Sequence, residues 1–357
     1  MNAVTRIGQV GEKAVFRRHH RKPDGRSLFL YGFAKPDGVS LPEGNDPVAK
    51  GGELRWHPFR REWNVYAAHR QNRTFKPSSA EDPLAPSKPG GAVTEIPFET
   101  FEVAVFGNKF TSLHPEAPDP PEIPGVSSQP AVGACEVVVY TPEQTGSLYT
   151  VGQERRRLLL SAWNDRYEAL FQQGCAFVMP FESRGEEVGV TLHHPHGQIY
   201  GFGEVPQVQR QMASAFDDGF SLERLLPQWS EYSVDEAGGV SAFCPPFARF
   251  PFEVWLTPRR RVPGPWDFSE EESDGFAHLL GEVTRRYDRF FGRDTAYMLT
   301  LHAAPKGCEQ TFHFTAQFYP ILRAPGRVKF LASVEQGTGV FTVDVMPEEA
   351  ARTLRAQ

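Results

Sequence analysis

The segment Thr191-Leu192-His193-His194-Pro195-His196-Gly197-Gln198-Ile199-Tyr200 brings three histidines within four residues and continues as a strand-like apolar pair. Alternate residues of an extended segment share a face, so the pattern predicts that His194, His196 and Gln198 present two imidazoles and an amide together. A neutral imidazole attacks phosphorus to form a phosphoramidate, and a glutamine amide can donate to a phosphoryl oxygen. The segment therefore favours phosphorus chemistry, with Gly197 letting a phosphate approach the backbone. A metal site or a set of buried, hydrogen-bonded histidines is the alternative that the same residues leave open.

The segments around this motif repeat along the chain. A strand over residues 135–142, an amphipathic helix over 156–171, a strand over 176–179 and the motif strand are followed by a similar series at 252–258, 276–291, 296–299 and 314–319. The nearly constant offset of about 120 residues indicates two copies of one β-α-β-β unit. Only the first copy keeps the histidines, because Thr315-Ala316-Gln317 stands in the second where His194-Pro195-His196 stands in the first. We expect an α+β fold in which two such halves form antiparallel sheets flanked by helices.

The length of the chain also predicts two packed units, since 357 residues exceed the usual size of a single hydrophobic core. We place an irregular arm, rich in Gly, Pro and charged residues and holding at most a hairpin, over residues 1–50. The half that carries the motif then covers residues 51–205, and the second half covers residues 206–357.

Charge and cysteine content exclude several classes of protein. A net charge of −6 argues against a nucleic-acid partner. Cys135, Cys175, Cys244 and Cys308 lie too far apart in the sequence for a zinc knuckle or a redox dithiol, which favours reduced thiols. We expect a cytoplasmic protein with no membrane partner, since no segment has the apolar length of a signal peptide or of a membrane span.

The motif His194-Pro195-His196-Gly197-Gln198 resembles the signature of the galactose-1-phosphate uridylyltransferases, the transferase branch of the histidine-triad superfamily. The resemblance covers roughly residues 53 to 345 and includes further blocks. These blocks are Arg55-Trp56-His57-Pro58-Phe59 with Glu62-Trp63, His69-Arg70 with Arg73, Val105-Phe106-Gly107-Asn108-Lys109-Phe110, and Lys329-Phe330 with Glu335. The family fold, two histidine-triad-like halves, agrees with the duplicated unit.

The resemblance implies a reaction by double displacement. His196 would attack the α-phosphorus of UDP-glucose, release glucose 1-phosphate and leave a uridylyl-histidine, which galactose 1-phosphate would then attack. Gln198 and His194 would assist His196. Substrate-binding roles are implied for Arg70, Arg73, Asn108, Ser183, Thr191, Lys329, Phe330 and Glu335. Family members are homodimers, in which the C-terminal sugar-phosphate residues would reach the partner's site.

Metal sites are where this chain departs from the family. The family pattern often carries zinc on a Cys pair, a later His and the first His of the signature, and a second metal on a Glu and three His. Only His194 and His302 match these ligands; the other positions hold Asp82, Ala85, Gln144, Met212, Thr315 and Gln317. One imidazole with an amide and a carboxylate makes a poor zinc site. We therefore expect no bound metal and no cofactor, and a hydrogen-bonded Asp82 that faces an Arg or a His.

Two other functions fit part of the pattern. A nucleoside-diphosphate-sugar or dinucleoside-polyphosphate phosphorylase would use the same histidine with inorganic phosphate as acceptor. Lys329-Phe330 and Glu335 distinguish these reactions, because they resemble sugar-phosphate contacts that a phosphate acceptor would not require. A non-catalytic nucleotide-sugar-binding protein is the third reading, against which the intact His196-Gly197-Gln198 argues. Ser183 stands where the family usually has an Asn that contacts phosphate, which leaves the identity of the second sugar phosphate open.

Overall fold

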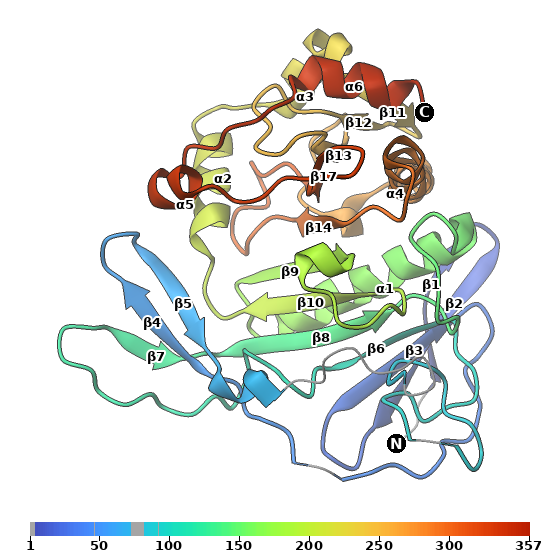
Figure 1. Cartoon of the computed structure of the whole chain (residues 1–357). Coiled ribbons are helices and arrows are strands. Elements are labelled where there is room, and N and C mark those ends of the chain that lie inside the picture. The colour runs from blue at the N-terminus through green and yellow to red at the C-terminus, as the bar shows by residue number, and fades with distance from the viewer. Residues whose placement is uncertain (1–3, 46, 73–81, 92) are drawn as a thin grey trace.

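A 12-stranded antiparallel sheet runs through the computed structural model, which describes residues 4–45, 47–72, 82–91 and 93–357 (Figure 1). In spatial order its strands are β1 (Val4–Val10), β2 (Lys13–Arg21), β3 (Ser27–Gly32), β6 (Val103–Gly107), β8 (Gly133–Val139), β10 (His196–Phe202), β9 (Phe177–Arg184), β14 (Tyr297–His302), β15 (Thr315–Pro320), β13 (Val254–Pro258), β12 (Val240–Phe243) and β11 (Ser233–Ala237). A second sheet joins β5 (Glu62–Tyr66), β4 (Glu53–His57) and β7 (Ser128–Pro130), and a short one joins β16 (Leu322–Ala324) and β17 (Arg327–Val328).

Helices and 3-10 turns make up the rest of the regular secondary structure in the described residues. They are α1 (Gly152–Gln172), α2 (Gln207–Asp217), α3 (Leu222–Leu225), α4 (Glu270–Phe291), α5 (Ser333–Thr338) and α6 (Pro347–Arg355), with 3-10 turns η1 (Ala68–Asn72), η3 (Glu186–Val188), η4 (Leu226–Gln228), η5 (Ser230–Tyr232) and η6 (Pro265–Asp267). Within the described ranges no helix combines the length and the apolar character that crossing a membrane requires.

The duplicated unit is visible in the order of the elements. The first copy is β8-α1-β9-β10 and the second is β13-α4-β14-β15. The copies meet where β9 pairs with β14, with Ser183 opposite Met298, so both halves share one sheet. This arrangement confirms the α+β class expected from the repeat, and it joins the two predicted sheets into one.

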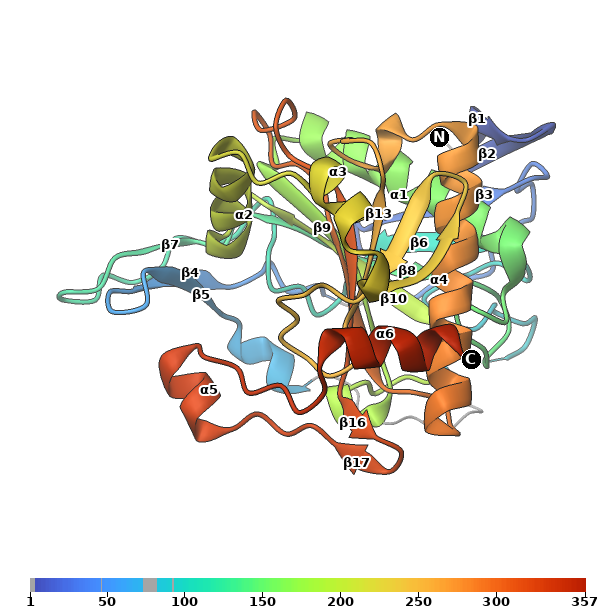
Figure 2. The ribbon, with the colours of Figure 1, turned by 90° about the horizontal axis from the view of Figure 1, so that it is seen from above.

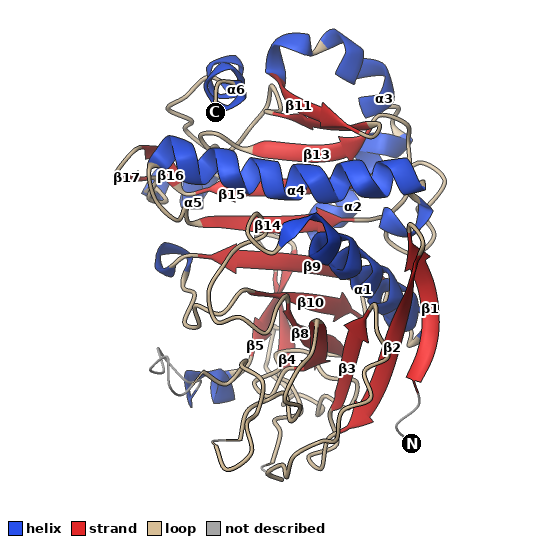
Figure 3. Cartoon of the chain, turned by 90° about the vertical axis from the view of Figure 1, so that its right-hand side faces the viewer, coloured by secondary structure: helices blue, strands red, loops and turns tan. Residues whose placement is uncertain are grey.

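Helices α1 and α4 cover the same face of the sheet and lie side by side on it (Figure 3). Their apolar stripes, including Leu158, Leu159, Leu279 and Leu280, are fully buried in the main core. Burial of each such side chain contributes roughly 1.5 to 3 kcal/mol. Helix α4 begins directly after Ser269, which forms a capping box with Glu272 and so satisfies amides that the first turn leaves free.

The N-terminal segment is more regular than predicted. Residues 4–32 form three antiparallel strands that extend the sheet, so an irregular arm over residues 1–50 is wrong for this part. Leu28 and Leu30 pack into a small core on one face of β3, while Phe29 and Tyr31 join the main core on the other. Two glycines that suggested irregularity, Gly11 and Gly25, adopt positive φ values in the turns between these strands.

Candidate functional site

Strand β10 sets the direction of the motif side chains. Ile199 is completely buried in the core beneath α1, so strand alternation turns His196 and Gln198 to the opposite face of the sheet. A Cβ at Gly197 would collide with the Tyr140 hydroxyl and lie 2.7 Å from the Phe181 carbonyl oxygen. The predicted role of Gly197 is therefore wrong, because the missing Cβ makes room for Tyr140 on the helical side and leaves the His196 face unaffected.

The ring of His196 is held in one tautomer. Its Nδ1 lies 2.7 Å from the backbone oxygen of His194, and a carbonyl only accepts, so Nδ1 carries the hydrogen and donates it. Burial, which is the largest cause, lowers the pKa of His196 below its ordinary value. The ring is therefore neutral near pH 7, with the lone pair on Nε2. This is the protonation state that a nucleophilic imidazole requires.

His194 does not share that face. It lies in a bend before β10, and its buried ring contacts Asp82 Oδ2 through Nδ1 and the Thr141 backbone oxygen through Nε2, both at 2.7 Å. Partial burial alone would raise the pKa of Asp82, but hydrogen bonds from His194 and from the Leu84 amide hold it below its ordinary value. The expectation that Asp82 faces an Arg or a His is confirmed.

Gln198 is oriented by Asn108, which follows β6. The Asn108 side-chain amide donates to Gln198 Oε1 at 3.3 Å, and its own oxygen accepts from the Phe110 amide at 2.9 Å. Because Gln198 uses its oxygen on Asn108, its NH2 group is the part that can donate to a ligand. The pair thus presents a neutral hydrogen-bond donor on the same face as His196.

Two cavities meet at His196. The first encloses about 300 Å³ and is lined by Asn108, Phe110, Thr191 and Gln198, with Glu95 also in its wall. The second encloses about 290 Å³ and is lined by residues that include Glu182, Ser183, Arg184 and His194. Since His196 lines both, a phosphorus atom at its Nε2 could carry a group into each cavity. Strand order produces this junction, because β10 lies between β8 and β9.

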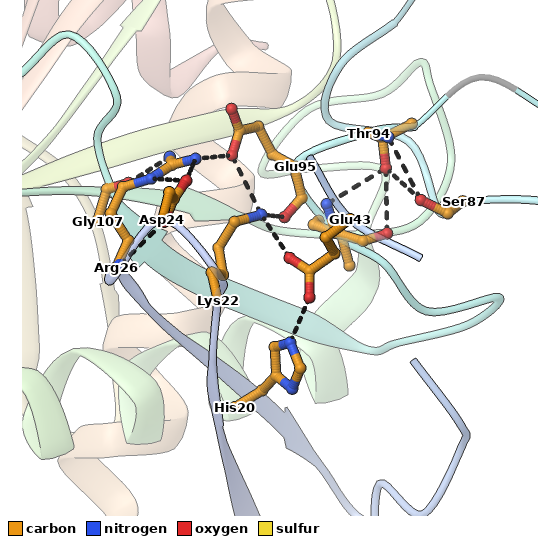
Figure 4. Close-up of polar contacts among 10 residues, drawn as sticks. His20, Lys22, Asp24, Arg26, Glu43, Ser87, Thr94, Glu95 and Gly107 are labelled. Carbon is orange, nitrogen blue, oxygen red and sulfur yellow. Dashed lines mark hydrogen bonds and ion pairs between the residues drawn. The ribbon is translucent and has the colours of Figure 1, made fainter. Parts of the chain in front are cut away.

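Glu95, in the wall of the first cavity, belongs to a buried network of ion pairs and hydrogen bonds that the sequence did not predict (Figure 4). The carboxylate oxygen Oε2 lies 2.8 Å from Arg26 Nη2 and 3.4 Å from Lys22 Nζ, and the second oxygen is turned away from both cations. Lys22 also lies 3.2 Å from Glu43, which in turn contacts His20 at 2.6 Å. Chain positions 20–26, 43 and 95 carry no shared motif, so no sequence signal connects them.

The other predicted substrate-binding residues lie in different parts of the structure. Ser183 and Thr191 each line one of the two cavities. Arg70 donates to the Phe110 carbonyl at 2.7 Å and lies 3.5 Å from the hydroxyl of Tyr200, which continues the His196–Gln198 face. Arg73 lies outside the described residues.

The C-terminal candidates lie together, away from the cavities at His196. Lys329 Nζ donates to Glu335 Oε1 at 2.5 Å, and the Ala332 and Thr342 amides donate to the same carboxylate. The Ala332 amide, Lys329 and the Thr342 amide together lower the pKa of Glu335 to about 2. Phe330 is 78% exposed, and none of the three lines the cavities at His196. Figures 1 and 2 show α5 at the periphery, joined by extended segments.

Comparison with known protein families identifies the family of this chain. Residues 49–206 match the family Galactose-1-phosphate uridyl transferase, N-terminal domain, and residues 232–356 match Galactose-1-phosphate uridyl transferase, C-terminal domain. The chain belongs to the galactose-1-phosphate uridylyltransferase family. This confirms the resemblance that the motif suggested.

Individual members of this family are similar over most of the chain. A galactose-1-phosphate uridylyltransferase from Thermotoga maritima is 36% identical over 319 residues, 85% of this chain and 98% of the relative. One from Streptomyces lividans is 30% identical, over 94% of this chain and 96% of the relative. A solved structure titled "Structure of uridylyltransferase" has a TM-score of 0.76 at 26% identity, covering 85% of this chain and 97% of that one.

A more distant neighbour shows the fold alone. An ADP-glucose phosphorylase from Arabidopsis thaliana superimposes with a TM-score of 0.64 at 17% identity. The galactose-1-phosphate uridylyltransferase fold is therefore shared with a phosphorylase, so the fold by itself does not choose the acceptor.

The residues at the two family metal positions do not fit a metal. Both ring nitrogens of His194 are engaged, and no group of three or more His, Cys, Asp or Glu among the described residues could hold an ion. At the second position, Gln209 donates to His302 Nδ1 at 3.2 Å, and His302 Nε2 lies 2.8 Å from Thr300 Oγ1. Burial lowers the pKa of His302 to about 4, so its ring stays neutral within a hydrogen-bonded chain.

Proposed function

We propose that this chain is a UDP-glucose–hexose-1-phosphate uridylyltransferase that exchanges UMP between UDP-glucose and galactose 1-phosphate. One observation carries the proposal: His196 has a fixed tautomer with a free Nε2 lone pair at the junction of two cavities. The proposal is supported by membership of a family whose curated relatives carry the name galactose-1-phosphate uridylyltransferase.

The site geometry supports a specific first half-reaction. The uridine of UDP-glucose would occupy the cavity lined by Asn108 and Glu95, and the α-phosphorus would then lie near His196. The Nε2 lone pair forms the N–P bond while the bond from phosphorus to the bridging oxygen breaks, and the electron pair leaves with glucose 1-phosphate. The ring retains its Nδ1 hydrogen and becomes cationic, and the His194 carbonyl stabilises that charge by accepting the hydrogen bond.

Charge on the transferring phosphoryl group requires donors. The Gln198 NH2 group would donate to a nonbridging oxygen without adding a competing charge. In the second half-reaction, a phosphate oxygen of galactose 1-phosphate forms the new P–O bond, the N–P bond breaks, and its electron pair returns to Nε2. Each cycle therefore restores neutral His196. No step of this scheme uses a metal.

We also propose that the protein is a homodimer whose sites are completed by the partner. Lys329 and Glu335 are hydrogen-bonded to each other, and neither they nor Phe330 line the cavities beside His196 in their own chain. A second copy could bring the exposed Phe330 and its neighbours to the acceptor side. A cytoplasmic location and the lack of a nucleic-acid partner remain predictions from composition.

Isotope exchange tests the proposed reaction. Purified protein incubated with UDP-glucose and labelled glucose 1-phosphate, without galactose 1-phosphate, is expected to move label into UDP-glucose, because the first half-reaction is reversible. Galactose 1-phosphate, and not inorganic phosphate, is expected to yield a new uridylylated product. Absence of exchange would contradict the double displacement, and turnover with inorganic phosphate alone would favour a phosphorylase.

A further inference from the structure

Two contacts connect Asp82 to the nucleophile through His194, and a third holds the His194 ring. Asp82 Oδ2 lies 2.7 Å from His194 Nδ1, the opposite ring nitrogen lies 2.7 Å from the Thr141 oxygen, and the His194 oxygen lies 2.7 Å from His196 Nδ1. The side chains of His194 and Asp82 are 0% and 9% exposed. A buried group in this setting must satisfy its hydrogen bonds within the protein.

Donor and acceptor counting constrains the hydrogens of this group. The Thr141 carbonyl only accepts, so His194 Nε2 carries a hydrogen. Asp82 accepts from the Leu84 amide at 2.9 Å through Oδ1. A single hydrogen lies between Asp82 Oδ2 and His194 Nδ1, and the buried pair has no net charge whichever of the two atoms carries it.

We propose that Asp82 and His194 form a buried hydrogen-bonded pair that positions His196 for attack, at the place where the family pattern has zinc ligands. This proposal rests on the proposed function of His196. Asp82 is a positioning residue, since it acts through His194 and touches neither the reacting atoms nor the nucleophile ring.

The pair acts by restraining the His194 backbone. With its ring held between Asp82 and Thr141, His194 keeps its carbonyl directed at His196 Nδ1. That hydrogen bond leaves the lone pair on Nε2. Without it, the hydrogen of a neutral imidazole can move to Nε2, which then has no lone pair for attack. A neutral pair with fixed donors thus replaces the ordering that a zinc ion and its ligands would provide.

The substitution Asp82→Asn tests the pair with little change in volume. We expect kcat to fall about 10- to 100-fold, because the buried hydrogen bond between Asp82 and His194 is weakened, while KM for UDP-glucose changes much less. The matched control is Asp235→Asn, which removes a carboxylate that contacts Arg286 at 2.6 Å in the second half, far along the sheet from β10. The control is expected to lower thermal stability and to leave kcat within about twofold of wild type.

Nuclear magnetic resonance on histidine-labelled full-length protein gives a readout that a purely structural role would not move. In the wild type we expect a hydrogen on His194 Nε2 and a hydrogen on His196 Nδ1 alone, with the signals assigned from His194→Gln and His196→Ala. In Asp82→Asn we expect a mixture of His196 tautomers. A wild-type His196 that carries its hydrogen on Nε2, or an Asp82→Asn variant with unchanged kcat, would overturn the proposal. A wild-type protein without isotope exchange would instead refute the proposed function itself.

Discussion

At the scale of single residues, the proposed function depends on which nitrogen of His196 carries its hydrogen. The sequence predicted the shared face of His196 and Gln198, because alternation along a strand depends only on local geometry. It misplaced His194, since the bend at His194 and Pro195 is set by Asp82 and Thr141, which are distant in the chain. Tertiary contacts of this kind leave no periodic signal in the sequence.

The lowered pKa of His196 predicts the pH profile of the enzyme. Attack requires the neutral ring, so kcat/KM for UDP-glucose is expected to fall as pH decreases through a pKa below the ordinary value of 6.5. Between about pH 7 and 8 the profile should be flat on this limb. Initial rates across the range, with the unfolding temperature followed in parallel, measure the pKa. A decline that begins above pH 7 without unfolding would contradict the neutral, buried imidazole.

At the scale of elements, the duplicated β-α-β-β unit was predictable and the N-terminal strands were not. Four elements recur with their apolar stripes, and that repetition survives divergence of individual residues. Strand β2 instead carries Arg17, Arg18, His19 and His20 in succession. Four consecutive basic or polar residues are typical of an exposed loop, and the sequence does not show the partners that bind them in the fold. Arg17, for instance, donates to Asp165 of α1 at 2.6 Å.

The network at Glu95 predicts a specific kinetic effect. Glu95→Gln weakens the pairing with Lys22 and Arg26 and removes a carboxylate acceptor from the wall of the first cavity. We expect KM for UDP-glucose to rise roughly 10-fold while kcat stays within about twofold, since the wall does not touch the reacting atoms. The exposed Glu122 supplies a control as Glu122→Gln. If Glu95→Gln and Glu122→Gln had the same kcat and the same KM for UDP-glucose, Glu95 would play no part in binding the uridine.

At the scale of the whole molecule, the two halves share one sheet. The C-terminal segment with Lys329, Phe330 and Glu335 lies away from the cavities at His196 of the same chain. We do not expect metal ions to stabilise this arrangement. The ring nitrogens of His194 are hydrogen-bonded to Asp82 and Thr141, and those of His302 to Gln209 and Thr300. Activity should therefore survive exhaustive chelation, and elemental analysis should find well under one zinc or iron per chain. Stoichiometric metal that is lost together with activity would refute this prediction.

Shared sites predict complementation between inactive variants. Mixing His196→Ala with Glu335→Ala under random subunit exchange places both lesions in one site of each mixed dimer and leaves the other site intact. About a quarter of all sites should then recover, because half of the dimers are mixed. Transfer assays before and after exchange measure the recovery, with each variant alone as the baseline. No regained activity despite demonstrated exchange would place Glu335 in its own chain's site or outside any site.

The covalent intermediate is the most direct test of the role assigned to His196. Protein is incubated with UDP-glucose labelled in the α-phosphate, separated from free nucleotide, digested and analysed by mass spectrometry. We predict an acid-labile uridylyl group on the peptide that contains His196, discharged by galactose 1-phosphate and absent from the His196→Ala variant. Label on another residue, or wild-type turnover by His196→Ala, would contradict a nucleophilic His196.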